Sequence, residues 1–329
     1  MLNQIRKFGM ILGAKCFYRR SSCRRSTTYH RRLQFEHCED RCMLATFSVT
    51  NVNDGVVTDF GDQPGTLRQA IFDANETPGT DTIDFDPAVF NTPTTINLTL
   101  GPLFITESVT IDATDGMGNL RNITITAAAN SGIFNITDFT ESAKLVTLVG
   151  LTLTGGNTSG TGGAIFSAEQ LVLRDSVIHN NFAGAGGAIY MDAANAGPTP
   201  RELLRIENSV IRDNTSGGNG GGVFIDTPSI LTPTADTFLI TGSTFTNNQT
   251  LDFGSVGGGL YARFRGAPDS VPQLTITGTE FTSNRADRAG GGVFALIQQH
   301  ASVTITDSLI TGNAGSSGGG IFAHFALAA

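Results

Sequence analysis

The sequence contains no tryptophan, and its four cysteines all lie within the first 42 of its 329 residues. Charged residues make up only 15% of the chain, compared with about 25% in an average globular protein. No apolar run reaches the roughly 18 residues that a membrane-spanning helix needs, which excludes an integral helical membrane protein. A hydrophobic content of 40% provides for a core and argues against an intrinsically disordered chain.

Glycine is abundant, with 40 residues, and short aliphatic clusters alternate with polar turns. Frequent turns and short apolar runs are typical of an all-β chain. The basic residues are unevenly placed: residues 1–42 carry ten of the 21 Lys and Arg but only three acids, and Lys144 is the single lysine after them. We therefore treat residues 1–45 as a basic export or targeting leader, disordered or removed, and exclude it from the fold.

Two other interpretations of the leader stay open: a nucleic-acid-binding tail, and a start codon placed upstream of the true one. The acidic remainder of the chain makes nucleic acid a poor partner, because phosphates attract a positive surface. The segment 31–45 contains Phe35–Glu36, Glu39–Arg41 and Met43–Leu44. It resembles the arginine-rich LEPR-xLL motif of very large bacterial surface and secreted proteins, although Cys38 replaces the usual leucine. This resemblance implies export, with the body of the protein outside the cytoplasm.

Two phrases recur in the second half of the chain. The first is Gly-Gly, a small residue, an aliphatic residue and an aromatic residue; its aromatic members are Phe166, Tyr190, Phe224, Tyr261, Phe294 and Phe322. The second is an alternating strand and a polar turn that lead to an asparagine; these asparagines are Asn181, Asn214, Asn248, Asn284 and Asn313. The positions ten, eight and three residues before each asparagine are apolar in all five copies. Such self-similarity is typical of a repeat architecture.

Each repeat is too short to bury its own apolar face, but stacked copies join these faces into one continuous core. Corresponding strands then pair in parallel, about 4.8 Å apart, and positions two apart point to the same side. We predict an all-β fold, a right-handed parallel β-helix (β-solenoid). The repeated asparagines are expected to form a ladder of amide hydrogen bonds, and the glycines to form tight corners.

The alternation of Gly-Gly-Ala-Ile-Tyr phrases with Ser-x-Phe/Ile-x-x-Asn phrases resembles polymorphic outer-membrane-protein repeats and the wider pectate-lyase-like β-helix superfamily. The segment Thr66–Asn75 resembles the CSLREA segment that opens many such exported proteins, with Gly65, Thr66 and Gln69 in place of the usual Cys, Ser and Glu. Thr66 and Gln69 also form a capping-box pattern, followed by apolar residues that share one helical face. We expect a helix that caps the N-terminal end of the core.

Residues 46–149 are expected to form this cap and the irregular first coils, with strands at 82–85, 95–100, 108–111, 122–125 and 145–153. Residues 150–329 are expected to form regular repeats that stop inside a repeat, so that the chain is a fragment truncated at its C-terminus. The alternative is that the open end pairs with a partner. End-to-end self-association through the uncapped C-terminal coil would then follow, because an unpaired strand edge tends to associate.

No arrangement of residues in the repeats predicts catalysis or a cofactor. Asp175 and Asp307 share a repeat position, but the copies between them have Asn or Gly there. The two carboxyls would lie roughly 19 Å apart, beyond the ~5–10 Å of a paired-carboxylate mechanism. The histidines at 179, 300 and 324 share no repeat position and are expected to be ordinary surface residues. Two acidic groups, 54–62 and 81–86, have the oxygen ligands that calcium prefers, but acidic surface loops explain them more simply.

Strand alternation places the aliphatic residue before each aromatic inward, so the six aromatic side chains face outward in a row. This row would run beside Asp192, Asp226 and Arg263. Exposed aromatic rows can stack on sugar rings, and a patch above about 400 Å² often marks a binding site. The alternative is that long loops, such as 193–202 and 226–236, fold over the row and bury it.

We predict a non-enzymatic exported module of the cell surface or outer envelope, extracellular in location, with a structural or adhesive role. Its partners would be polysaccharide or an envelope or surface protein, with no nucleic acid and no integral membrane segment. The alternative prediction, a polysaccharide lyase or glycoside hydrolase, rests on fold analogy alone, because the pectate-lyase-like superfamily hosts both kinds of protein. A third alternative is a piece of an autotransporter passenger, with its barrel encoded downstream.

Overall fold

The computed structural model of the protein describes residues 44–138, 140, 143–193, 201–227, 236–265, 271–298 and 300–326. All of these ranges belong to one compact unit, Cys42–Ala329. The leader up to residue 43, including most of the segment that resembles the LEPR-xLL motif, lies outside the described residues.

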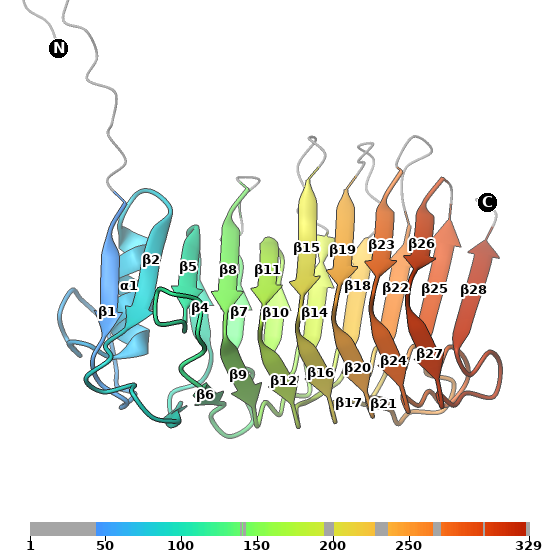
Figure 1. Ribbon diagram of the computed structural model, residues 1–329, viewed down its shortest axis with the longest axis horizontal. Coiled ribbons are helices and arrows are strands. Elements are labelled where there is room, and N and C mark those ends of the chain that lie inside the picture. Colours follow the sequence, from blue (N-terminus) through green and yellow to red (C-terminus); the bar gives the residue numbers. More distant parts are fainter. Residues whose placement is uncertain are drawn as a thin grey trace, which may run out of the picture. The chain divides into compact units, whose positions relative to one another are not determined.

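Parallel strands make up nearly all of the secondary structure, and they are stacked in three long sheets and one short sheet (Figure 1). The first sheet contains β1 (Thr46–Val49), β2 (Asp81–Phe85), β5 (Val109–Asp112), β8 (Leu145–Val149), β11 (Gln170–Arg174), β15 (Glu202–Glu207), β19 (Thr237–Thr241), β23 (Gln273–Thr277) and β26 (Ser302–Thr306). The second sheet contains β3 (Thr94–Asn97), β6 (Ile123–Thr126), β9 (Leu151–Thr154), β12 (Val177–His179), β16 (Val210–Arg212), β20 (Thr244–Thr246), β24 (Glu280–Thr282) and β27 (Leu309–Thr311).

The third sheet carries the recurrent aromatic residues. It contains β4 (Leu103–Ile105), β7 (Phe134–Ile136), β10 (Ile165–Ser167), β14 (Ile189–Asp192), β18 (Val223–Thr227), β22 (Leu260–Phe264), β25 (Val293–Gln298) and β28 (Ile321–Ala326). The short sheet contains β13 (Phe182–Ala183), β17 (Thr215–Ser216) and β21 (Gln249–Thr250). From β2 onward each turn of the coil visits the first, second and third sheets in order, whereas helix α1 alone lies between β1 and β2.

The coil is right-handed, as the sequence predicts. In Figure 1 the strands of the first sheet run downward at the front, those of the third sheet run upward behind them, and the chain advances from left to right. This is the hand that parallel strands with crossover connections almost always adopt. The fold is therefore a parallel β-helix with one helix in the described residues.

The repeat positions predicted to face inward are stacked in register in the core. In the first sheet Leu171 pairs with Leu204, and the same position continues through Phe238, Leu274 and Val303. The second sheet stacks its own apolar position in the same way, and the rings of Phe245 and Phe281 lie 4.6 Å apart. Burying a side chain of this size contributes about 1.5–3 kcal/mol, so the continuous stack is the main stabilising element.

Helix α1 (Leu67–Glu76) lies at the N-terminal end, and its apolar face is buried, as predicted; the buried apolar residues are Leu67, Ala70, Ile71 and Ala74. Thr66 is the N-cap, and its Oγ1 accepts a hydrogen bond from the backbone N–H of Gln69 at 3.2 Å. The predicted capping box is only half formed. Gln69 Oε1 accepts from the N–H of Gln63 at 2.9 Å, because the Thr66 N–H is already bonded to the Gln63 carbonyl.

The early coils differ from the sequence prediction in two respects. The segment predicted as one strand at 145–153 is two strands, β8 and β9, because Gly150 has φ 71° and turns the chain between sheets. Strands β1, β4 and β7 were not predicted, because their short apolar runs carry no recognisable copy of the repeat.

The two ends of the coil differ in burial. At the N-terminal end the helix covers the core, whereas in the last described turn Val303, Ile305 and Ile310 are only partly buried. Leu309 and Ile321 are 52% and 46% exposed there. No helix in the described ranges is long and apolar enough to span a membrane.

Candidate functional site

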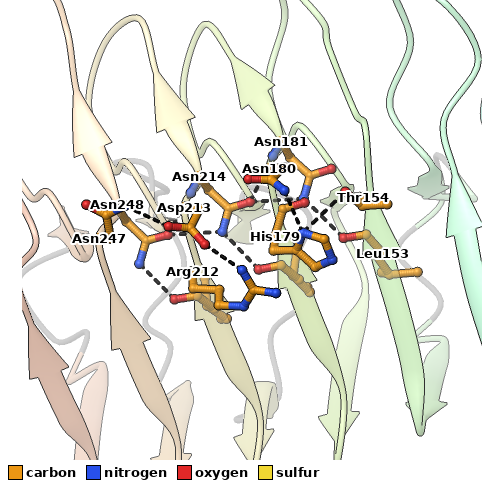
Figure 2. A network of polar contacts seen from close by, with 12 residues as sticks. Leu153, Thr154, His179, Asn180, Asn181, Arg212, Asp213, Asn214, Asn247 and Asn248 are labelled. Atoms are coloured by element: carbon orange, nitrogen blue, oxygen red, sulfur yellow. Dashed lines mark hydrogen bonds and ion pairs between the residues drawn. The ribbon is translucent and has the colours of Figure 1, made fainter. Parts of the chain in front are cut away.

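The five repeated asparagines form a hydrogen-bonded ladder along the coil, and Figure 2 shows its first three members, Asn181, Asn214 and Asn248. Asn181 Nδ2 donates to Asn214 Oδ1 at 2.9 Å, and Asn214 Nδ2 donates to Asn248 Oδ1 at 3.0 Å. The ladder continues to Asn284 and Asn313 at 3.0 and 2.9 Å. From Asn214 onward each Oδ1 also accepts from the backbone N–H of the asparagine one turn before it, and the Oδ1 of Asn181 accepts from the N–H of Gly156. The ladder therefore satisfies backbone groups that the corner would otherwise leave buried without partners.

The residues before the first three ladder asparagines, Asn180, Asp213 and Asn247, make a looser set of polar contacts on the outside of the coil. His179 Nδ1 is 2.9 Å from Asn180 Nδ2, and Arg212 bonds Asp213, which also accepts from Asn247 at 2.6 Å (Figure 2). Burial lowers the pKa of His179, and the charge of Arg212 adds to this effect. His179 is half-buried, whereas the histidines at 300 and 324 are exposed.

The repeat position of Asp175 and Asp307 is a corner with left-handed backbone. Its members have φ between 48° and 58°, and they are Asp175, Asn208, Gly242, Gly278 and Asp307. Gly, Asn and Asp are the residues that adopt this conformation at least cost. Backbone geometry therefore accounts for the residue choice at this position.

The six aromatic side chains stand in register on the outer side of the third sheet, and we call them the aromatic row. Successive ring centroids lie 6.0, 4.9, 4.5, 5.3 and 5.3 Å apart from Phe166 to Phe322. The three central rings, Phe224, Tyr261 and Phe294, are only 4–7% exposed and form a second hydrophobic cluster with Val256 and Ala289. Residues of the glycine-rich corners thus pack on the centre of the row, and its end rings are half-buried.

A charged group lies beside the centre of the aromatic row. Asp226 accepts hydrogen bonds from Arg263 and from the Tyr190 hydroxyl, the latter at 3.0 Å. The Arg263 guanidinium lies 5.2 Å from the centroid of Phe224. Burial raises the pKa of Tyr190, and the neighbouring Asp226 charge adds to it, so the phenol stays protonated. Most of the long loops named above lie outside the described residues.

The register of the third sheet extends the aromatic row by two positions toward the N-terminus, to Asn135 and Phe104. Asn135 thus stands between Phe104 and Phe166, at a position that carries an aromatic ring in the other turns. A hollow of about 210 Å³ lies here, and we call it the Asn135 hollow. Phe166 and three hydroxyl-bearing residues, Ser131, Thr158 and Thr161, contribute to its wall.

A second hollow of about 210 Å³ lies at the other end of the row, and we call it the Phe322 hollow. Its wall combines the rings of Phe294 and Phe322 with Arg288, Ser317 and His324. The two hollows differ in chemistry, because this one carries a guanidinium and an imidazole whereas the Asn135 hollow has no charged side chain in its lining.

Glu169 is the carboxyl group whose pKa is shifted furthest in the described part of the chain. It is 4% exposed, its carboxylate accepts from the N–H of Lys144 at 3.1 Å, and its Oε1 has no hydrogen-bond partner among the described residues. Burial raises the pKa of Glu169 to about 7, and the charge of Asp138 acts in the same direction. Burial would also raise the pKa of Asp138, but hydrogen bonds from Thr140 and the charge of Lys144 leave it lowered.

The two acidic groups considered for calcium have protein partners. Asp54 is paired with Arg68 at 2.6 Å, and Asp62 accepts from Thr58. Asp81 accepts from the N–H of Ala45, although its Oδ2 is buried without a partner among the described residues. Within the ranges given above, no group of three or more His, Cys, Asp or Glu side chains is placed to hold a metal ion.

Sequence reasoning identified the ladder asparagines and the aromatic row, but it missed Asn135 and Glu169. A signal for Asn135 was present, because Gly132–Asn135 is a degenerate copy of the Gly-Gly phrase with Asn in the aromatic position. Glu169 lies outside the apolar positions that align the repeats, although Glu202 and Asp236 also stand twelve residues before a ladder asparagine, so only the fold reveals its burial. Whether the row binds a ligand stays a prediction. Comparison of the chain with protein-family models, with curated proteins and with solved structures found no match.

Proposed function

We propose that this chain is a non-enzymatic, exported β-helix module of the cell surface or outer envelope that holds polysaccharide along the outer face of the third sheet. The observation that carries the proposal is the aromatic row, whose half-buried end rings each border a hollow lined with hydrogen-bonding groups. Binding sites of small ligands typically combine an aromatic wall with a few polar groups that fix orientation.

The extended register supports a polymeric rather than a single small ligand. Parallel strands repeat about every 4.8 Å, so the row from Phe166 to Phe322 offers a line of groups along the axis of the coil. The two hollows lie at different turns of the coil along this line. A single polysaccharide molecule that follows the line could therefore occupy both. The proposed export and the surface or envelope location rest on the resemblance of segment 31–45 to an export motif. The proposed relation to polymorphic outer-membrane-protein repeats rests on the two recurrent sequence motifs of the second half of the chain.

A polysaccharide lyase or glycoside hydrolase is the second candidate. One observation favours it: Glu169 and Asp138 have pKa values shifted in opposite directions, the pattern of an acid and a base at one site. However, Glu169 is 4% exposed, so a polymer could not reach its carboxyl group without a change of structure. We therefore favour binding without cleavage.

The experiment is a panel of neutral and acidic insoluble polysaccharides incubated with the full chain, with and without calcium. We expect retention on at least one polymer and no release of reducing or unsaturated ends above a boiled control. Release of such ends would replace the binding proposal with the enzymatic one. Absence of retention on every polymer would contradict polysaccharide binding and leave a structural role or a protein partner.

A further inference from the structure

The Asn135 hollow occupies a defined place in the aromatic row. Reading along the third sheet, one position carries Phe104, Asn135, Phe166, Tyr190, Phe224, Tyr261, Phe294 and Phe322 in successive turns. Seven of these eight residues are aromatic, and the exception coincides with a hollow of about 210 Å³. The hollow therefore arises where one ring of an otherwise continuous series is replaced by a shorter, polar side chain.

The ring of Phe166 borders this hollow, and one face of the ring has no aromatic neighbour in the described part of the chain. Its plane is nearly parallel to that of Tyr190, at 14° and 6.0 Å, so Tyr190 covers one side of it. On the side of the preceding turn stands Asn135 instead of a ring. Phe166 is half-buried and lies in the wall of the hollow, so a planar or chair-shaped ring that enters there can pack on it.

The polar groups of the hollow have hydrogen-bonding capacity to spare. Within the described residues the Asn135 side chain makes no hydrogen bond; its Oδ1 is buried, and its Nδ2 is the group that can donate to a ligand in the hollow. Thr158 Oγ1 accepts from the Gly160 N–H, which leaves its proton free to donate, and Ser131 Oγ donates to the Gly132 carbonyl, which leaves its lone pairs free to accept. Amide and hydroxyl groups match the hydroxyls of a ligand that both donates and accepts.

The volume of the hollow and the absence of charge in its lining further limit the class of ligand that it can hold. All ten lining residues are uncharged, so the hollow offers no counter-charge to a phosphate, a uronate or a metal ion. Its volume is below the roughly 300–1,000 Å³ of pockets for drug-sized molecules, which suits a single ring. We infer that the Asn135 hollow is a subsite for one uncharged pyranose unit of a neutral polysaccharide, stacked on Phe166 and hydrogen-bonded by Asn135, Thr158 and Thr161. This inference rests on the proposed function and specifies the sugar class and its place.

The test fills the hollow. Asn135→Phe supplies the missing ring of the row without disturbing a hydrogen bond, so the fold is retained and the thermal midpoint is unchanged or higher. We expect this variant to bind neutral polysaccharide at least tenfold more weakly than the wild-type chain. Thr161→Val, which keeps the shape but removes one hydroxyl, should weaken binding about fivefold, as expected for one hydrogen bond. Gln273→Phe adds a ring to an exposed position of the first sheet and is the matched control, with unchanged binding.

The probes are insoluble glucan, mannan and galactan as neutral polymers, polygalacturonate and alginate as acidic ones, each at low and high salt with the full chain. Salt-insensitive retention on a neutral polymer that is lost in Asn135→Phe supports the inference. Equal retention of wild type and Asn135→Phe overturns the subsite but leaves the proposed function intact. Retention on acidic polymers alone, abolished by high salt, also overturns it and directs attention to the Phe322 hollow. No retention on any polymer overturns the inference and the proposed function together.

Discussion

The asparagine ladder and the aromatic row are both stacks of one repeat position, yet they differ in how completely they are filled. In the ladder every asparagine from 181 to 313 bonds its neighbour, and the interior members are buried. In the row the central rings are buried, the end rings are half-buried, and Asn135 interrupts the series. A stack that must satisfy backbone groups tolerates no gap, whereas a stack on the outer face can open a hollow without loss of the coil.

Breaking the ladder should have the largest effect. Asn214→Ala removes hydrogen bonds to the Ile178 carbonyl, the Asn181 N–H and both neighbouring amides in a fully buried site. Each buried group left without a partner costs about 1–3 kcal/mol, so we expect the free energy of unfolding to fall by about 4 kcal/mol. Urea denaturation followed by circular dichroism measures it.

The matched control is the same change at the end of the ladder. Asn313 is only partly buried, so water replaces the lost amide, and Asn313→Ala should cost about half as much. Equal losses in the two variants would show that position in the ladder does not matter.

Emptying the centre of the aromatic row should have the next largest effect. Phe224 is 4% exposed and touches the rings on both sides, so Phe224→Ala leaves a cavity and should cost about 3 kcal/mol. Phe104→Ala, at the same position of the sheet but 55% exposed, should cost less than about 1 kcal/mol. The two thermal midpoints measure the difference, and a larger loss at Phe104 would contradict the view that the row is closed at its centre and open at its ends.

The third prediction concerns pH dependence and the buried carboxyl group of Glu169. The asparagine ladder consists of neutral amides and does not titrate, whereas this carboxyl group does. The pKa of Glu169 lies above its value in the unfolded chain, near 7 instead of 4.5, so the folded state holds the proton more tightly. The free energy of unfolding should therefore fall as the pH rises through this window, by up to about 3 kcal/mol between about pH 4.5 and 8. Carboxyls with lowered pKa, such as Asp213, act below this window and with the opposite sign.

Glu169→Gln should abolish this decrease, because the neutral amide has no proton to lose. Urea titrations at about pH 5 and about pH 8 measure the slope, and the exposed Glu280→Gln is the control that keeps it. A slope that persists in Glu169→Gln would assign the titration to another group.

The smallest effect is expected for a single hydroxyl at the side of the row. Tyr190→Phe keeps the ring and removes the bond to Asp226, whose carboxylate retains Arg263, and should cost about 1 kcal/mol. In Tyr261→Phe the lost hydroxyl has no hydrogen bond among the described residues, so stability should change by less than about 0.5 kcal/mol. Equal changes in both variants would mean that the Asp226 contact contributes nothing.

Much of the coil could be predicted from repeated positions. Apolar residues ten, eight and three before each asparagine can be stacked in only one register, and the first and second sheets follow this register. The division of 145–153 into β8 and β9 could not be predicted from that pattern, because it depends on the left-handed backbone of Gly150. The half-formed capping box at Thr66 depends on a tertiary partner, Gln63, that no local rule supplies.

The sequence by itself determined that this chain is a parallel β-helix, which residues point into its core and where its amide ladder runs, because those features depend only on spacing along the repeat. Tertiary structure alone decided which rings of the aromatic row are covered, that a hollow opens beside Asn135, and that Glu169 is buried. Such properties depend on what neighbouring turns place around a side chain. A repeat of period 24 to 37 residues does not specify those neighbours, because its corners vary in length from one turn to the next.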